Sequence, residues 1–173
     1  MEKVYFLRTA RLGFSQWTRG DSRQAALLWG DPAVTRFLCV SGRFSPQQIA
    51  ERLETEVKNG ESRHVQYWPV FLLTSGELVG CCGLRPHGDA FELGVHLRPA
   101  FWGQGYAAEA AGAVIRYAFE VIGADRIFAG HHPQNEASRK LLSRLGFVSI
   151  GDEFYAPTGL HHPSYELRRG ERR

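Results

Sequence analysis

The spacing of apolar and polar residues predicts one strand and two helices at the start of the chain. Residues 11–16 have the alternation of a strand. Asp21 is placed to cap a helix that Gly30 ends, because a short acceptor side chain suits a helix start and glycine suits the position after its end. A second, short helix is expected over residues 31–38.

A third helix and three strands follow. Ser45, with proline next and glutamine three residues on, forms a capping box, and the helical pattern ends at Gly60. Short turn sequences then separate three apolar runs, a spacing typical of antiparallel hairpins. These runs are residues 67–74, 77–85 and 90–97.

The second half of the chain indicates helix, strand, helix and two strands. An amphipathic helix over residues 107–123 separates the run 90–97 from the strand RIFAG, 126–130. Because a helix of about four turns is a crossover connection, those two strands should be parallel. The remaining elements are a helix over 136–145 and strands over 147–155 and 164–168. We therefore expect a mixed α/β fold with a mostly antiparallel sheet of six to seven strands.

Composition limits the class of protein. With 173 residues and 43% hydrophobic content, the chain is expected to form a single domain over residues 1–173. Cys39 and the adjacent Cys81 and Cys82 lack disulfide or metal-site spacing, which favours a reducing compartment, and the cysteine pair is expected to pack in a strand. The sequence shows neither an apolar leader nor a membrane span, so we expect a soluble cytoplasmic protein with no membrane partner.

The charge pattern argues against a nucleic-acid partner. The net charge is only +3, and its visible concentration is the C-terminal RRGERR. Such a segment is typical of a solvated tail. We expect no direct binding of nucleic acid.

The most informative segment is the turn RPAFWGQGYA between the strand 90–97 and the helix 107–123. Amides at a helix start lack intrahelical acceptors and lie at the positive end of the helix dipole, so they bind anions. The segment therefore predicts a phosphate or pyrophosphate site. Its candidate amides are those of Gly103, Gln104, Gly105, Tyr106 and Ala107.

Two other kinds of phosphate site are disfavoured. A Walker loop needs GK[ST] at a fixed spacing, and none follows the turn. Gly103, Gly105 and Ala108 do spell the GxGxxA of a dinucleotide fingerprint, but the acid that would hold the ribose is missing. Three antiparallel strands also precede the turn, unlike a dinucleotide-binding half.

Three segments in order resemble the GNAT superfamily of N-acetyltransferases, and within it the RimJ/RimL-type branch that acetylates the N-terminal amine of ribosomal proteins. They are LRTARLGFSQWTRGDSRQAALLWGDPAVTRFL, ELGVHLRPAFWGQGYAAEA and HHPQNEASRKLLSRLGF, and together they cover nearly the whole chain. The resemblance implies the GNAT fold, with a splayed pair of parallel strands. It also implies an enzyme that uses acetyl coenzyme A, with pyrophosphate on the turn and the pantetheine arm between those strands, where Val95 and Leu97 offer backbone partners.

The turn departs from the superfamily at its first position. Trp102 stands where most members carry glutamine or arginine, so amides must do most of the phosphate binding, with Arg98 as a candidate charge partner. We count Trp102 among the turn residues that bind the cofactor. Its side chain itself is expected to be a core aromatic.

Acetyl transfer from a thioester to an amine needs a base, an oxyanion donor and a proton for the departing thiolate. Glu92 is the leading base, and strand alternation places it on one face with Gly94, which would leave room for a ligand, and His96, the reserve base. An exposed strand charge is an equally good interpretation of Glu92. The resemblance places the thioester carbonyl beside the backbone amide of Val95.

The helix over 136–145 carries two further candidates. The resemblance implies that Ser138 protonates the thiolate, whereas an ordinary first-turn serine would satisfy backbone amides. Asn135 is placed to cap this helix, and the resemblance adds a hydrogen bond to the pantetheine arm. One residue can serve both purposes.

The acceptor is the least determined part. His131, His132, His161 and His162 lack the spacing of a zinc site, so no metal is expected, and by analogy some of them line the acceptor pocket. We expect a protein N-terminal α-amine, with a lysine, a polyamine or an aminoglycoside as alternatives. A noncatalytic acyl-coenzyme A sensor and a homodimer paired through the late strands also stay open.

Overall fold

The computed structural model describes residues 3–170, so the charged residues 171–173 of the expected tail lie outside the described part. The strands are β1 (Leu7–Arg8), β2 (Leu12–Phe14), β3 (Tyr67–Leu72), β4 (Leu78–His87), β5 (Ala90–Leu97), β6 (Arg126–Gly130), β7 (Val148–Tyr155) and β8 (Leu160–Arg168). The helices are α1 (Ser22–Trp29), α2 (Pro32–Thr35), α3 (Pro46–Arg63), α4 (Tyr106–Tyr117) and α5 (Glu136–Arg144). A single 3-10 turn, η1 (Pro99–Phe101), precedes α4, and a π-helical turn, η2 (Ala118–Ile122), extends it.

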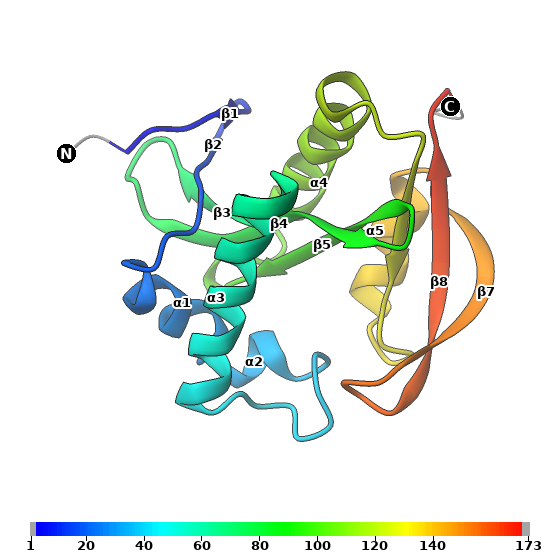
Figure 1. Ribbon diagram of the computed structural model, residues 1–173, viewed down its shortest axis with the longest axis horizontal. Coiled ribbons are helices and arrows are strands. Elements are labelled where there is room, and N and C mark those ends of the chain that lie inside the picture. Colours follow the sequence, from blue (N-terminus) through cyan, green and yellow to red (C-terminus); the bar gives the residue numbers. More distant parts are fainter. Residues whose placement is uncertain (1–2, 171–173) are drawn as a thin grey trace.

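The strands form one sheet in the order β1-β2-β3-β4-β5-β6-β8-β7. Every pairing is antiparallel except β5 with β6, which confirms the expected mixed sheet and its parallel pair. Residues 3–170 contain eight strands, one more than the expected maximum, because the short segment Leu7–Arg8 pairs with β2 and was not expected from the sequence. Figure 1 shows β1 at one end of the sheet and β7 at the other.

Helices cover both faces of the sheet, and the adjacent cysteines show how. Cys82 and Trp68 belong to a core cluster with α4, whereas Cys81 and Tyr67 belong to a second cluster with α1 and α3. Successive residues of a strand point to opposite faces, so β3 and β4 contribute to both cores. The expectation that Cys81 and Cys82 pack in a strand is confirmed.

Helix α3 extends past its expected end. Gly60 lies inside the helix, which continues to Arg63. A Cβ at position 60 would lie 2.6 Å from the side-chain amide nitrogen of Gln66, and glycine leaves that space free. The capping box of Ser45 and Gln48 is present, and the helix ends at His64, whose φ is 59°. The expected end at Gly60 was wrong because the glycine serves a tertiary contact.

Other details of the elements also differ from the expectation. The side chain of Asp21 does not cap α1 but accepts hydrogen bonds from the backbone and hydroxyl of Thr18, at 2.7 and 2.8 Å. Helix α2 ends at Thr35, short of the expected residue 38. Strand β8 begins at Leu160 and not at 164. The turn was expected to extend from Pro157 to Pro163, but Tyr155 already pairs with Leu160, so the observed turn is shorter.

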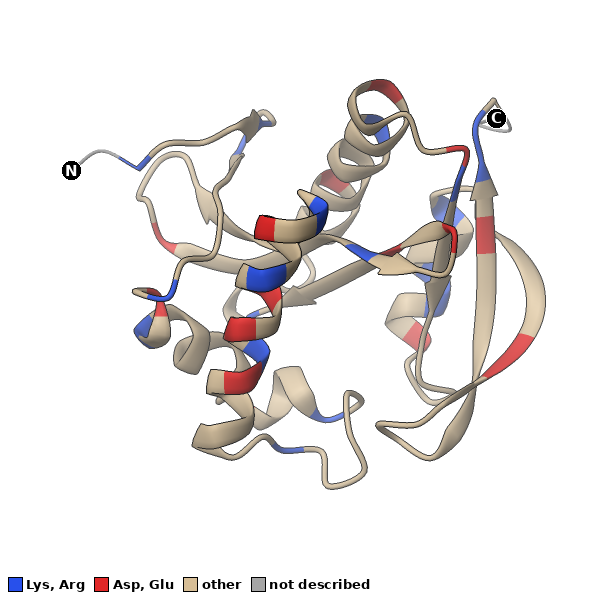
Figure 2. Ribbon diagram, viewed as in Figure 1, with Lys and Arg blue, Asp and Glu red and all other residues tan. Residues whose placement is uncertain are grey.

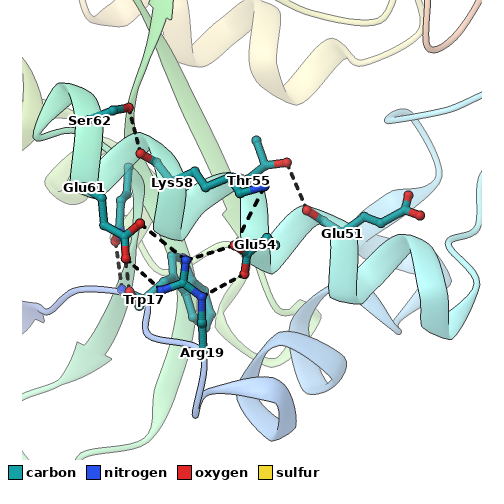
Figure 3. A network of polar contacts seen from close by, with 9 residues as sticks. Trp17, Arg19, Glu51, Glu54, Thr55, Lys58, Glu61 and Ser62 are labelled. Atoms are coloured by element: carbon teal, nitrogen blue, oxygen red, sulfur yellow. Dashed lines mark hydrogen bonds and ion pairs between the residues drawn. The ribbon is translucent and has the colours of Figure 1, made fainter.

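A polar network joins the segment before α1 to the outer face of α3. The Arg19 guanidinium contacts Glu54 at 2.9 Å and Glu61 at 2.7 Å, as Figure 3 shows. Both acids lie on a solvated side of α3 that carries charges of both signs (Figure 2). Among residues 3–170, no helix combines the length and apolar character needed to cross a membrane.

Candidate active site

The glycine turn is exposed and leads directly into α4. Gly103 has a φ of 71° and Gly105 a φ of 81°, both in the left-handed region that favours glycine. No side chain of the described residues caps α4 at Gly105, so the amides of its first turn stay available to an anion. The turn has the backbone form expected of a phosphate site.

Arg11 contacts the glycine-bearing part of this turn. Arg11 Nη1 donates to the carbonyl of Gln104 at 3.0 Å, and the guanidinium lies 4.1 Å from the Tyr106 ring centre. Its charge is balanced by Glu109, whose Oε2 lies 2.6 Å from Nη2. Arg98 donates to the carbonyl of Leu78 at 2.8 Å and lies 3.3 Å from Glu77, and its role as a charge partner of the phosphate stays a prediction. Arg11 and Gln104 are 93 positions apart, so no local signal pointed to the pair.

The expected placement of Trp102 in the core was wrong. Its side chain is 52% exposed, and its indole Nε1 donates to the carbonyl of Leu97 at 2.8 Å. Because Leu97 is the last residue of β5, this hydrogen bond places the indole at the end of that strand. Trp102 thus stays on the surface of the turn, where a ligand can contact it.

Strands β5 and β6 separate soon after they meet. They pair at two positions, Phe91 with Ile127 and Glu92 with Phe128, and β5 then continues along β4 alone. The result is a gap between two parallel strands that opens toward the glycine turn.

The backbone of Val95 faces this gap. Arg98 N–H donates to the Val79 carbonyl at 2.9 Å, which makes these two residues a hydrogen-bonded pair of the β4–β5 ladder. Such pairs alternate along an antiparallel ladder, so Val95 and Leu97 turn their amides and carbonyls away from β4. The Leu97 carbonyl already accepts from Trp102, whereas Val95 borders the cavity described next.

A cavity of about 140 Å³ passes through the gap. This volume is roughly ten times what one water needs. Asn135 and Ser138 of α5 line it together with Val95, and Tyr67 and Glu92 line it on the side of α1 and α3. The cavity therefore connects the two faces of the sheet. The expected site residues Leu97 and 102–107 do not line it, because Leu97 is the last residue of β5 and residues 102–107 follow that strand.

Helix α5 is capped as expected. The Asn135 side-chain oxygen accepts a hydrogen bond from the Ser138 amide at 3.2 Å. The Ser138 hydroxyl makes no hydrogen bond to any described residue, so it does not satisfy backbone amides in the way an ordinary first-turn serine would. That hydroxyl is therefore available to a ligand in the cavity.

Glu92 is held by two neighbours that the sequence did not indicate. The Tyr67 hydroxyl donates to its Oε1 at 3.1 Å, and His87 Nδ1 lies 3.5 Å from its Oε2. Burial first, and then the Glu92 charge, raises the pKa of Tyr67 well above its usual value, so the phenol keeps its proton. The hydrogen bond to Glu92 raises the pKa of His87. Glu92 is thus a positioned carboxylate and not merely an exposed charge.

His96 is poorly suited to act as a base. Burial, followed by the charges of Arg52 and Arg85, lowers its pKa well below the usual value. Its Nδ1 accepts a hydrogen bond from the Trp29 indole at 3.3 Å. Gly94, on the same strand face, leaves room for the Tyr67 ring, since a Cβ there would lie 2.3 Å from Cζ. The space expected for a ligand over Gly94 is therefore filled by protein.

Three of the four singled-out histidines reach the cavity. His131, His132 and His162 line it, whereas His161 packs against Phe154. His131 Nδ1 donates to the His132 carbonyl at 2.8 Å, so its Nε2 accepts from Tyr165, 3.1 Å away. Within residues 3–170, no three His, Cys, Asp or Glu side chains form a group that could hold a metal ion.

Comparison with known proteins gives a consistent result. Residues 11–148 match the family model described as an acetyltransferase (GNAT) domain. The uncharacterized N-acetyltransferase YoaA of Bacillus subtilis is 29% identical over 84% of each chain. The FsC-acetyl coenzyme A-N(2)-transacetylase of Aspergillus fumigatus is 28% identical over 83% of this chain and 65% of that one.

The fold also recurs in solved structures. The ribosomal-protein-S5-alanine acetyltransferase from Vibrio fischeri superposes with a TM-score of 0.76, over 99% of this chain and 100% of the other. The two sequences are 20% identical, so this likeness establishes the fold alone.

Proposed function

The chain belongs to the GNAT family of N-acetyltransferases, and on that premise we propose that it acetylates the α-amine of a protein N-terminus, with acetyl coenzyme A as the donor. The observation that carries the proposal is the cavity through the β5–β6 gap, with Glu92 at one side and Ser138 at the other. An acetyl acceptor and a thioester donor must approach from different directions, and residues from both layers of the molecule line this cavity.

The residues present fit acetyl coenzyme A. The uncapped amides of 103–107 suit its pyrophosphate, with the exposed Trp102 beside them, and the gap edge suits its pantetheine arm. The backbone groups of Val95 and Leu97 and the side chain of Asn135 are its proposed hydrogen-bond partners. When bound, acetyl coenzyme A supplies a thioester whose carbonyl carbon accepts the amine.

In the proposed reaction, one side chain of this protein accepts a proton and another donates one. Glu92 accepts a proton from the attacking amine through a water, while Tyr67 and His87 hold the carboxylate in place. The Ser138 hydroxyl gives a proton to the sulfur as the carbon–sulfur bond breaks and the carbon–nitrogen bond forms. The Val95 amide donates to the carbonyl oxygen, which gains charge at that moment.

The choice of an α-amine rests on chemistry and on a similar structure. An α-amine has a pKa near 8 and a lysine near 10.4, so a carboxylate that acts through water deprotonates the α-amine more readily. The name of the Vibrio fischeri protein specifies an alanine of a ribosomal protein, which supports a protein acceptor for this chain as well.

The test is an acceptor panel with acetyl coenzyme A and the full chain. Peptides with a free α-amine, matched peptides with a blocked α-amine and one internal lysine, and a polyamine are compared by thiol release, and mass spectrometry locates the acetyl group. Acetylation confined to free α-amines is expected. Turnover of the blocked peptide or of the polyamine alone would contradict the proposed acceptor.

A further inference from the structure

Arg52 of α3 borders the cavity on the side of Tyr67 and Glu92. Its Nε is buried and has no hydrogen-bond partner among the described residues. The neighbouring Arg85 differs, because its Nε donates to Glu56 Oε1 at 2.9 Å. Of the two guanidinium groups at this cavity wall, only Arg85 has an anionic partner within the described chain.

The acids near Arg52 are already engaged. Glu56 is fully buried and also accepts a hydrogen bond from the Tyr67 amide at 2.8 Å. Glu92 is held by the Tyr67 hydroxyl and by His87. Neither carboxylate makes a hydrogen bond or an ion pair with Arg52, and the charge of Glu56 acts on Arg52 only from a distance.

The Arg52 charge persists in spite of its surroundings. Burial, and then repulsion from Arg85, lowers the pKa of Arg52, but a guanidinium stays protonated in proteins. The rings of Trp29 and Phe44 lie 5.1 and 5.5 Å from its Cζ. Aromatic faces attract a cation but do not accept the in-plane hydrogen bonds of the fork. Arg52 is only partly buried as a residue, and no described acceptor makes a hydrogen bond or ion pair with its guanidinium, so an anionic ligand group that reaches this guanidinium from the cavity would be stabilised.

We propose that Arg52 binds a carboxylate of the acceptor, so that the preferred acceptor is an amine that also carries a carboxylate. This inference rests on the proposed acetyl transfer and names the class of its acceptor. The planar fork of arginine matches a carboxylate in bidentate geometry. Glu92 and Arg52 then receive the two opposite charges of one molecule, the ammonium before deprotonation and the carboxylate. A free amino acid, or an N-terminal peptide segment with an acidic side chain, supplies this chemistry.

Two matched acceptor pairs distinguish these sources. The first pair is alanine and alaninamide, and the second is a peptide that begins Ala-Glu and its Ala-Gln equivalent. For each enzyme, the acid-to-amide ratio is kcat/KM for the acid divided by kcat/KM for its amide. The amide also changes the pKa of the neighbouring amine, but that effect is the same for every enzyme. A difference in this ratio between the wild type and a variant therefore isolates the contribution of Arg52.

Arg52→Met should lower the acid-to-amide ratio by about tenfold or more in at least one pair, because hydrogen bonds to charged groups are worth about 1.5–3 kcal/mol. Arg52→Lys keeps the positive charge but loses the bidentate hydrogen bonds of the guanidinium, so an intermediate acid-to-amide ratio is expected. This variant tests the proposal if Arg52→Met does not fold. Arg63→Met removes an exposed arginine of the same helix and should leave the ratio unchanged.

The outcomes separate the two proposals. Equal acid-to-amide ratios in the wild type and both Arg52 variants would overturn the carboxylate site while leaving acetyl transfer intact. If the wild type acetylates neither these four acceptors nor the free α-amine peptides of the acceptor panel, the proposed acetyl transfer itself fails, independently of Arg52. Binding of acetyl coenzyme A, measured by calorimetry, should be the same in all variants.

Discussion

The Tyr67 hydroxyl donates a hydrogen bond to Glu92 Oε1 at 3.1 Å, although β4 lies between the strands that carry the two residues. The contact is possible because the Tyr67 ring occupies the space over Gly94. A carboxylate fixed in this way has one orientation toward the cavity. That orientation is the geometric requirement for a base that works through a positioned water.

Glu92→Gln should lower kcat by about 100-fold near pH 7, in line with the usual contribution of a general base. The loss should shrink as the pH rises through the pKa of the acceptor amine, because the amine then needs no base. Rates measured from pH 6 to 9.5 check this. Glu120→Gln, an exposed change on η2, is the control, and a loss that does not vary with pH would argue for a structural effect.

Substitutions of Asn135 and Ser138 should differ in their effect on stability. Asn135→Ala removes the cap of α5 and should lower the free energy of unfolding by about 1 kcal/mol. Ser138→Ala removes a hydroxyl without a described partner, so stability should change little while kcat falls by about tenfold or more. Urea unfolding and steady-state kinetics measure both, with the exposed Ser143→Ala as control. Undiminished turnover in Ser138→Ala would remove this residue from the mechanism.

Glycines at the turn are needed for backbone conformation and not for space. A side chain at Gly103 would meet nothing within 4 Å, yet its φ is 71°, so Gly103→Ala should cost about 1 kcal/mol and weaken binding of acetyl coenzyme A. Gly112 lies within α4 with room for a Cβ, so Gly112→Ala should instead stabilise by about 0.5–1 kcal/mol. Thermal unfolding and calorimetric titration provide the comparison. Equal effects of the two substitutions would contradict the conformational argument.

His87 should make stability depend on pH. Its pKa is raised in the folded protein, chiefly by the hydrogen bond to Glu92, so its stabilisation is complete below the unfolded value near 6.5 and is lost as the pH rises through the folded value. Solvent screening limits the effect to less than about 1 kcal/mol. The difference in unfolding free energy between wild type and His87→Gln should therefore be largest near pH 5.5. A difference that grows toward pH 8 would have the wrong sign.

Local signals in the sequence were sufficient for most of the fold. The capping box at Ser45 and the cap at Asn135 act within one helical turn, and both are present in the structure. The end of α3 was missed because Gly60 accommodates Gln66, a contact between separate elements. Strand β1 was missed because two residues carry no readable period.

The site was only partly readable, for the same reason. The glycine turn and the first turn of α5 are contiguous segments, so the backbone form of the turn and the cap of the helix could be predicted, while their roles in binding and catalysis stay predictions. Arg11 and Tyr67 reach the site from positions far away in the sequence, 93 residues from Gln104 and 25 from Glu92. Side-chain chemistry alone does not reveal such pairs. Arg52 likewise stands out only once its neighbours are seen to be occupied.

Cys81 and Cys82 sit side by side on β4 but face different layers of the molecule. Burial raises the pKa of Cys81 to about 12 and that of Cys82 well above its usual range, so neither thiol alkylates while its layer is closed. The rate at which each one is alkylated therefore measures how often its own layer opens. Equal rates would mean that both faces of the sheet open in one cooperative event. A faster Cys81 would mean that α1 and α3 detach while α4 stays packed.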